Sequence, residues 1–386
     1  MMASGVEDTI SAEATLFVST ARAFLDKEAS LVHVRELYED GLSFDRAWWQ
    51  RAAGLGWTSL LVPEELGGGS VTGCPLRDLA SIAEEIGRAV APGPLNPVSA
   101  VLAALVAADN RDDHTETITA IVSGRAVASW AVDEPNRAFV PHEPLMTATS
   151  TPAGYRLDGA KDRVEAGPQA DLLLVTARTD GGPRQFIVSA GAPGIAVRRQ
   201  ACIDLVKHYA RVEFDAVEVD RAAAVGSLAQ TATLIDRQSQ IATVLQCAET
   251  VGILDAVLVM TIAWARDRHS FGRPLASYQA LKHRFADMTM WLHACRAITA
   301  AAVDAVDANS PEAQLWVSAA KSYLGEHAGP LVQDCVQLHG GIGVTWEHDL
   351  HLYLRRVCLY RNMFGTPSEH NKAIYGHAGR ERVPAW

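Results

Sequence analysis

The sequence contains few cysteines, and none of them are closely spaced. Six occur in 386 residues, without a CxxC or CxxxC pair, and the histidines show no HExxH spacing. Zinc sites and small disulfide scaffolds rely on closely spaced ligands, so the pattern fits neither class and no metal is expected. We expect mostly buried, reduced thiols, as in a cytoplasmic protein. The cysteines are Cys74, Cys202, Cys247, Cys295, Cys335 and Cys358.

Positive charge and long apolar runs are also scarce. Against 45 acidic residues there are 34 basic ones, which gives a formal net charge of −11. This balance argues against nucleic acid or an anionic membrane as the main partner. The longest apolar stretches, such as Val98–Ala108, are too short to span a bilayer, and the acidic N-terminus MMASGVEDTISAEATLF shows no signal peptide. We therefore expect a soluble, cytoplasmic protein.

Several nucleotide-binding and catalytic motifs are missing. No GxGxxG follows a predicted strand, and neither a P-loop nor a GxSxG segment is present. The Rossmann and P-loop NTPase interpretations therefore fail. Nothing resembles the GxSxG segment of α/β-hydrolases, and Ser/His/Asp or Cys/His catalysis stays an open alternative. Hydrophobic residues make up 48% and charged residues 20%, as in ordinary globular proteins. The length predicts two or three domains.

Hydrophobic periodicity divides the chain into three parts and predicts an α+β fold. Residues 1–125 show the helical period, with Ser43 and Asp45 at one helix start. Residues 126–228 show a period of 2 in seven short strands, which favours an antiparallel barrel or sandwich. Residues 229–386 return to long helices that predict a bundle, with Ser310 capping a helix from Pro311. The expected helices are Ala12–Leu25, Phe44–Ala53, Leu76–Ile86, Pro97–Ala108, Glu116–Ser123, Thr231–Ser270, Tyr278–Asp307 and Pro311–Leu338, and the expected strands are Ala126–Val132, Met146–Ser150, Tyr155–Leu157, Leu172–Thr176, Gln185–Ser189, Ile195–Arg198 and Tyr209–Phe214.

Two C-terminal segments carry the most specific motifs. Arg268-His269-Ser270-Phe271-Gly272 is followed by Gln279, and Gln337-Leu338-His339 leads into Gly340-Gly341-Ile342-Gly343. They resemble the RxxFG and QxxGGxG signatures of acyl-CoA dehydrogenases. The PEELGGG turn from residue 63 and the helix–strand–helix order match that family too. The resemblance spans nearly the whole chain and implies an N-terminal helical domain, a central antiparallel β domain and a C-terminal four-helix bundle.

These residue types suit a dinucleotide pyrophosphate. Arg268 can supply a charged fork, and Gly340 and Gly341 can let the backbone approach closely. The alternative is that Arg268 caps a helix and the glycines only make a turn. The resemblance implies FAD as cofactor, held across a subunit interface in a homo- or hetero-oligomer, usually a dimer of dimers. The implied cofactor-binding residues are Arg268, Phe271, Gln279, Gln337, Gly340, Gly341 and Thr366.

The resemblance implies an oxidoreductase, yet its catalytic base is missing. The family's carboxylate removes the α-proton of an acyl-CoA thioester while hydride leaves the β-carbon for flavin N5, and an electron-accepting flavoprotein then takes the electrons. The usual glutamate, 27 residues after Gln337, is Phe364, and the rarer position, 29 residues before Phe271, is Ala242. Glu249 lies on nearly the same helix face as Ala242, but roughly 10 Å further along the axis. We interpret Glu249 as a cavity or packing residue, with a catalytic role as the alternative.

The strands that should face the flavin also depart from the family pattern. Asp133-Glu134-Pro135 matches, but Phe139 lies in the continuation where the family has small and polar residues. Arg163 and Glu165 stand where a tryptophan and a threonine normally lie beside the flavin ring. These departures weaken the expectation that this chain's own β domain holds the ring.

Three hypotheses remain open. The chain is a complete acyl-CoA dehydrogenase with an unrecognised base, or one half of a heteromeric enzyme, or a non-enzymatic interaction protein on this scaffold. The second hypothesis follows actinobacterial steroid-degrading members, in which one partner lacks the base. Substrate-pocket candidates on the long helix are Gln246, Glu249 and Thr250. Their polarity predicts a polar or wide acyl pocket, suited to a steroid side chain or a functionalised acyl group.

Overall fold

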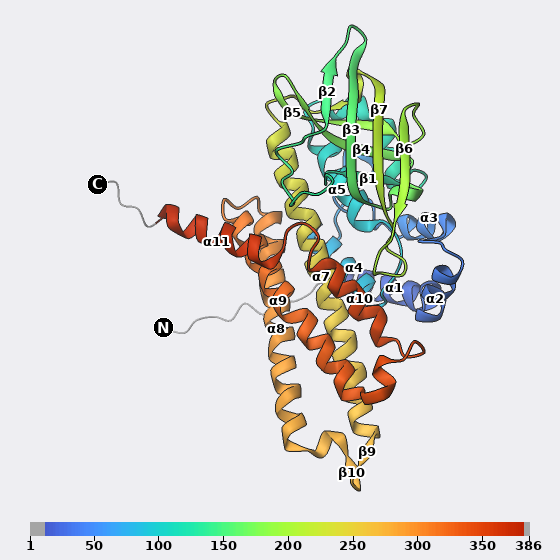
Figure 1. Cartoon of the computed structure of the whole chain (residues 1–386), viewed down its shortest axis with the longest axis vertical. Coiled ribbons are helices and arrows are strands. Elements are labelled where there is room, and N and C mark those ends of the chain that lie inside the picture. Colours follow the sequence, from blue (N-terminus) through green and yellow to red (C-terminus); the bar gives the residue numbers. More distant parts are fainter. Residues whose placement is uncertain (1–11, 382–386) are drawn as a thin grey trace.

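The computed structural model describes residues 12–381 as three groups of elements (Figure 1). A sheet lies at the upper end of the longest helix, a helical bundle surrounds that helix below, and the N-terminal helices lie beside both. Residues 1–11, which include most of the segment examined for a signal peptide, lie outside the described part of the chain.

The N-terminal group contains six α-helices. The sidechain carboxylate of Asp45 accepts a hydrogen bond from the amide of Ala47 at 3.0 Å and caps one of them, as the sequence predicted. The helices are α1 (Ala12–Glu28), α2 (Leu31–Glu39), α3 (Arg46–Gly54), α4 (Pro75–Arg88), α5 (Leu95–Ala107) and α6 (Thr115–Val122).

The central group is one eight-stranded sheet in the order β6-β7-β3-β2-β4-β5-β8, with β1 paired to β4. Pairing is antiparallel, as predicted, except that β4 runs parallel to β1 and meets β2 in parallel at one residue pair. β3 is longer than the sequence predicted. Two register shifts interrupt the alternation of inward- and outward-facing side chains along it, so the period of 2 does not continue through the strand. The strands are β1 (Ala128–Ala131), β2 (Thr147–Ser150), β3 (Gly154–Glu165), β4 (Leu172–Thr179), β5 (Gly182–Ser189), β6 (Ile195–Gln200), β7 (Tyr209–Asp220) and β8 (Ala224–Val225).

The C-terminal group is built around α7. This helix is long and apolar enough to cross a membrane, but 61% of its most apolar window is buried, as in a core helix. α9 begins at Ala313 rather than at Pro311, because Pro311 and Glu312 form a turn. In this turn the amide of Glu312 donates a hydrogen bond to Ser310 Oγ at 3.2 Å. The helices are α7 (Thr231–Asp267), α8 (Gln279–Asp307), α9 (Ala313–His339), α10 (Leu350–Tyr360) and α11 (Pro367–Glu381), and a short hairpin of β9 (His269–Ser270) and β10 (Arg273–Pro274) joins α7 to α8.

Two glycines bring α4 and α7 into direct backbone contact. A Cβ atom at Gly87 would lie 1.9 Å from the carbonyl oxygen of Glu249, and one at Gly252 would lie 1.9 Å from that of Glu84. Any larger residue at either position would push the helices apart. The seam between α4 and α7 is therefore closed to a ligand.

A buried network of charged side chains joins all three groups. Arg356 of α10 donates to Asp204, in the loop between β6 and β7, and contacts Glu249 of α7 at 3.4 Å. Lys207, from the same loop, donates to Glu165 of β3 at 2.9 Å and to the carbonyl of Gly93, before α5, at 3.3 Å. We call Asp204, Lys207, Glu165, Glu249 and Arg356 the buried charge network.

Removing Arg356 should destabilise the protein strongly. Arg356→Met leaves Asp204 and Glu249 buried without their cation, which costs about 3–5 kcal/mol of unfolding free energy. The neighbouring half-buried Arg355 is the matched control, and Arg355→Met should cost less than about 1 kcal/mol. Chemical denaturation of both variants measures the difference. Equal losses would show that the network contributes no more than a surface arginine does.

Candidate functional site

The position of the expected base is occupied by an aromatic cluster. Phe364 follows α10, has a φ of 56° and is buried. Its ring stacks on Trp130 of β1 at 6.1 Å between centroids and meets Phe139 edge-on at 5.5 Å. Such ring contacts are favourable and leave no room for a ligand between them. The place where a carboxylate would face a substrate is therefore filled by apolar side chains.

Neither of the other two positions supplies a base. Ala242 is buried, and its carbonyl accepts a hydrogen bond from Asn96 Nδ2 at 2.9 Å. Glu249 accepts from the Tyr360 hydroxyl at 2.6 Å and lies 3.7 Å from Lys207 Nζ. Burial, together with the Glu249 carboxylate, raises the pKa of Tyr360 well above its usual value, so its hydroxyl remains a donor. Glu249 is thus hydrogen-bonded and ion-paired within the charge network, and its interpretation as a cavity or packing residue stays a prediction.

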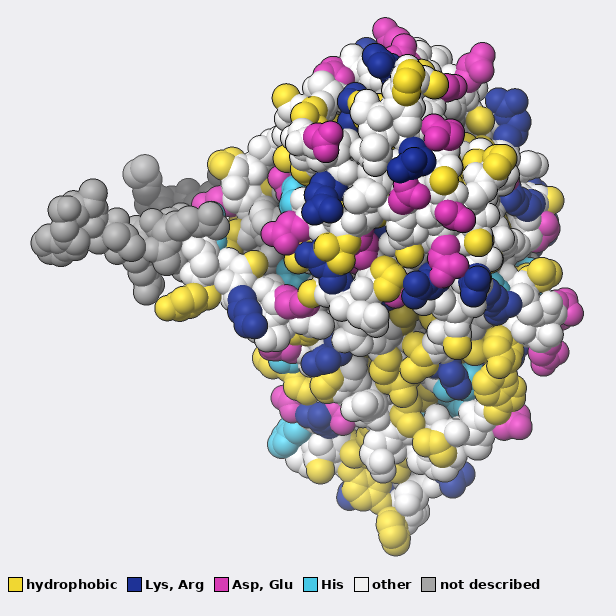
Figure 2. Space-filling view, turned by 45° about the horizontal axis from the view of Figure 1, so that its top comes forward, with side chains coloured by type: hydrophobic (Ala, Val, Ile, Leu, Met, Phe, Trp, Pro, Cys, Tyr) yellow, Lys and Arg dark blue, Asp and Glu magenta, His cyan; other side chains and the backbone are white. Residues whose placement is uncertain are grey.

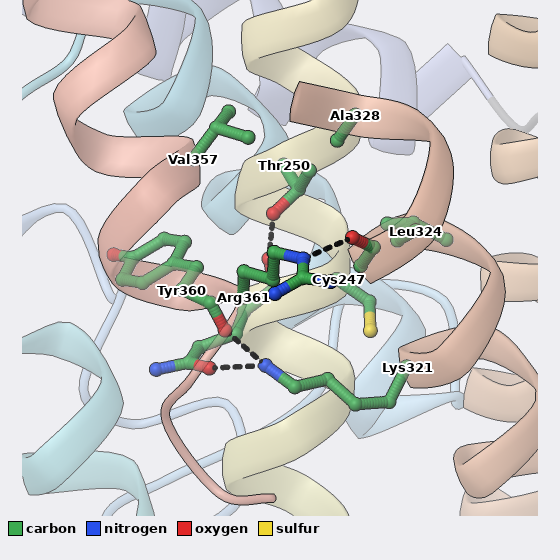
Figure 3. A pocket seen from close by; sticks show the side chains of 10 residues that line it. Cys247, Thr250, Lys321, Leu324, Ala328, Val357, Tyr360 and Arg361 are labelled. Atoms are coloured by element: carbon green, nitrogen blue, oxygen red, sulfur yellow. Dashed lines mark hydrogen bonds between the residues drawn. The ribbon is translucent and has the colours of Figure 1, made fainter. Parts of the chain in front are cut away.

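The wide acyl pocket predicted around these candidates stays a prediction, and the described structure shows a small cavity beside two of them. Figure 3 shows a cavity with Thr250 and Lys321 among its lining side chains. Gln246 also lines it, and its volume is about 10 Å³. This volume accommodates one water molecule at most. Lys321 Nζ fills the remaining space by donating to Gln246 Oε1 at 3.1 Å and to the carbonyl of Tyr360.

The sheet residues that replace the ring contacts are held in ion pairs. Arg163 Nε lies 3.3 Å from Asp133, and Glu165 accepts from Lys207. Burial raises the pKa of Asp133, while Arg163 favours its charged form. Glu165 is bound by Lys207 and Phe139 packs in the aromatic cluster, so neither presents a free hydrogen-bonding group to a flavin ring. The fit to the ring is therefore poor.

The ends of α7 and α9, by contrast, present the predicted cofactor residues together. The Arg268 amide donates to the carbonyl of Trp264 at 2.8 Å, and its guanidinium lies 6.0 Å from the Trp264 ring. That ring stacks on His339, next to Gly340, with 5.3 Å between centroids. Trp264 therefore places Arg268 and the glycine segment at the same end of the bundle. Gln337, which is exposed, lies there too.

The two glycines differ in what they require. Gly340 has a φ of 68° and a ψ of −142°, a conformation that essentially only glycine adopts. Gly341 has no positive φ, and a Cβ atom at either position would meet no atom within 4 Å. A turn alone explains Gly340 but not Gly341. Open space in front of Gly341 fits a backbone that a ligand or partner approaches.

Exposed apolar side chains surround this end. Phe271, in the β9–β10 hairpin, is 97% exposed with a φ of 50°, and Val344 is 75% exposed. Figure 2 shows hydrophobic side chains gathered over the lower part of the molecule, where the bundle lies. Such a patch is typical of a surface that another chain covers. Gln279, also exposed, begins α8 beside this hairpin.

Thr366 does not join the other predicted cofactor residues. It caps α11, because its amide and hydroxyl bond to Glu369 at 2.7 and 2.8 Å. The next residue, Pro367, packs against Gly325 of α9. Gly325 precedes His339 by 14 residues, which is roughly 21 Å along a helix. Within one chain, Thr366 therefore lies far from Arg268.

Sequence reasoning missed four buried cations: Lys161, Lys207, Lys321 and Arg356. Nothing in the spacing of a lysine or arginine distinguishes a buried one from an exposed one when its partners come from distant segments. The apolar flanks of Lys207, in Leu205-Val206-Lys207, are the only local signal, and this signal is weak.

Two family profiles match most of the chain. The profile described as "Acyl-CoA dehydrogenase, N-terminal domain" matches residues 11–124, and "Acyl-CoA dehydrogenase, C-terminal domain" matches residues 234–376. Acyl-CoA dehydrogenase IpdE2 of Mycobacterium tuberculosis is 29% identical over 92% of this chain and 94% of its own length. Acyl-CoA dehydrogenase FadE27 of the same organism is 31% identical over 83% of this chain and 85% of its own.

A solved structure gives a similar result. The chain is similar to one in the crystal structure of the ChsE4–ChsE5 complex from Mycobacterium tuberculosis, with a TM-score of 0.87 and 28% identity. The match covers 98% of this chain and all of that one. The similarity therefore extends through the helical groups and the sheet.

Lys321 should make the stability of the protein depend on pH. Burial lowers the pKa of Lys321 from 10.5 to about 8, so between these values the unfolded chain binds more protons than the folded one. Stability should therefore rise with pH across this window, by at most roughly 3 kcal/mol relative to Lys321→Met. Denaturation of both proteins from pH 7.5 to 10 measures the difference. A difference that stays constant with pH would contradict the assignment.

Proposed function

This chain belongs to the acyl-CoA dehydrogenase family, and we propose that it is the subunit without a catalytic base in a heteromeric enzyme of that family. Its relatives support an oxidoreductase that acts on CH–CH groups. In our proposal a catalytic homologue supplies the base and the acyl-CoA site, and this chain completes the FAD site of that homologue. The assembly, a cytoplasmic dimer of dimers, removes hydrogen from the α- and β-carbons of an acyl-CoA thioester.

The aromatic cluster at the base position is the observation that carries this proposal. A dehydrogenase needs a carboxylate within about 3 Å of the α-proton. Here Phe364 occupies that position and packs on Trp130 and Phe139. With the closed α4–α7 seam, the cluster leaves neither a base nor space for an acyl group at this position of the described chain.

In this proposal the α7–α9 end binds FAD. Bound FAD supplies the acceptor for the hydride that leaves the β-carbon. Arg268 would hold the cofactor's phosphates with a planar, permanently charged fork, and Gly340 and Gly341 would bring backbone amides close to them. Phe271 would cover the adenine, and Gln279 and Gln337 would donate hydrogen bonds. Because the sheet face suits the ring poorly, the ring would lie on the partner.

The whole-enzyme hypothesis needs Glu249 as the base, but that carboxylate is already bound by Tyr360 and Arg356. The non-enzymatic hypothesis does not explain the open space at Gly341 or the exposure of Phe271. A heteromer accounts for both observations. The name of the similar ChsE4–ChsE5 structure describes a complex of two different proteins, which supports the same arrangement.

Selection of the substrate then falls to the partner. Gln246 and Thr250, which suggested a wide pocket, enclose only a water-sized cavity in this chain. The acyl-CoA thioester, and the flavoprotein that accepts the electrons, would both be recognised by surfaces of the assembled enzyme. This chain would contribute binding and positioning of FAD, and no proton transfer.

Removing the arginine fork should release the cofactor. In the assembly co-purified from the native host, Arg268→Ala should weaken FAD retention by roughly 10–100-fold, because a charge-assisted bond is worth about 1.5–3 kcal/mol. Flavin absorbance per mole of complex after dilution measures the loss. Arg266, exposed two residues earlier, is the matched control. Equal flavin content in Arg268→Ala and Arg266→Ala would refute the assignment.

The chain by itself should not turn over acyl-CoA. Purified alone and supplied with FAD, it should show no acyl-CoA-dependent reduction of a ferricenium acceptor, whereas the co-purified assembly should. Phe364→Glu should not restore activity, because the new carboxylate would be buried in the aromatic cluster with no substrate beside it. Turnover by the unmodified single chain would remove the proposed role and require another base.

A further inference from the structure

A large groove lies on residues other than those of the proposed FAD site at the α7–α9 end. It has a volume of about 980 Å³ and is bounded by α1, α4 and α8, with one residue from α7. This size is that of a small-molecule site. More apolar than polar surface lines it, and its apolar residues are Ala14, Val18, Val71, Ala80, Ala248, Ala300 and Val303.

The arginines in and around this groove are already neutralised. Arg22 pairs with Glu85 at 2.6 Å. Arg77 pairs with Asp304 at 2.8 Å, and Arg296 pairs with Asp255 of α7 at 3.0 Å. Asp78 of α4 is likewise bonded, by the hydroxyls of Ser70 and Thr72. The groove therefore offers no free cation to an anionic ligand.

Besides the exposed Glu13, one charged residue of the groove is unpaired in the described chain: Glu84. It is half-buried, and no hydrogen bond or ion pair joins its carboxyl group to any residue from 12 to 381. Its backbone is fixed at the α4–α7 seam, where its carbonyl meets Gly252. Burial raises the pKa of Glu84 to about 7, and Arg296 opposes this shift. An acceptor held in place without a donor is a binding group for one.

We propose that this groove binds an elongated, apolar small molecule that carries one hydroxyl or amine group. The aliphatic walls bury the body of the molecule, and Glu84 accepts the hydrogen bond from its donor. A carboxylate of the same shape is disfavoured because it would face Glu84 with no free cation nearby. The site shares no residue with the FAD edge, so it stands or falls independently of the proposed function.

The test compares three probes with the same chain length on the full-length protein. Isothermal titration calorimetry with decylamine, 1-decanol and decanoate, all below their micellar concentrations, should show saturable one-to-one binding of the first two. Decanoate should bind at least about tenfold more weakly, since like charges repel in a partly buried site. Glu84→Gln should weaken decylamine binding by about tenfold, whereas Glu39→Gln, on the exposed surface of α2, should not.

Blocking the groove gives a second measurement. Ala300→Trp should abolish binding of decylamine and 1-decanol, and Ala297→Trp, at another exposed position of α8 outside the groove, should leave it unchanged. Equal binding of all three probes, or binding that survives Ala300→Trp, overturns the proposal. A change in sedimentation of the assembly with Ala300→Trp, without any probe binding, also overturns it and identifies a protein as the occupant.

Discussion

The buried charge network is the interaction on which the rest of the structure depends. Arg356, without any exposure to solvent, binds Asp204 from the sheet region and Glu249 from α7. Lys207 extends the same network to Glu165 and to the N-terminal group. Buried charges are costly unless they are fully paired, so each member holds the others in one geometry. Three groups of elements that could otherwise shift relative to one another are therefore locked together.

The buried charge network also fixes the helices in the interior of the chain. Glu249 accepts from Tyr360 and Arg356, so α7 is held against α10, while Gly87 and Gly252 hold it against α4. Catalysis requires a base near a substrate. In the proposed heteromer the catalytic homologue would supply the base, and this chain would support the site.

The opposite is true of the α7–α9 end. There Arg268 is exposed, Phe271 is almost fully exposed, and the missing side chain of Gly341 faces open space. Exposed apolar surface is unfavourable for an isolated chain and is typical of a surface that a second protein covers. An arginine and accessible backbone amides beside it suit a phosphate-bearing cofactor. In the proposed heteromer, this end would meet the partner and the phosphates of FAD.

The order of helices, strands and helices followed from the sequence, because hydrophobic periodicity is local. The absence of a base at Phe364 and the presence of the Arg268 motif also followed, because both depend only on spacing along the chain. Only the tertiary structure showed the small cavity beside Gln246 and Thr250 and the pairing of Glu249. Its partners Lys207 and Arg356 come from a loop and a helix far away in the sequence. Burial and pairing are properties of the folded chain, and no local pattern records which distant residues will meet.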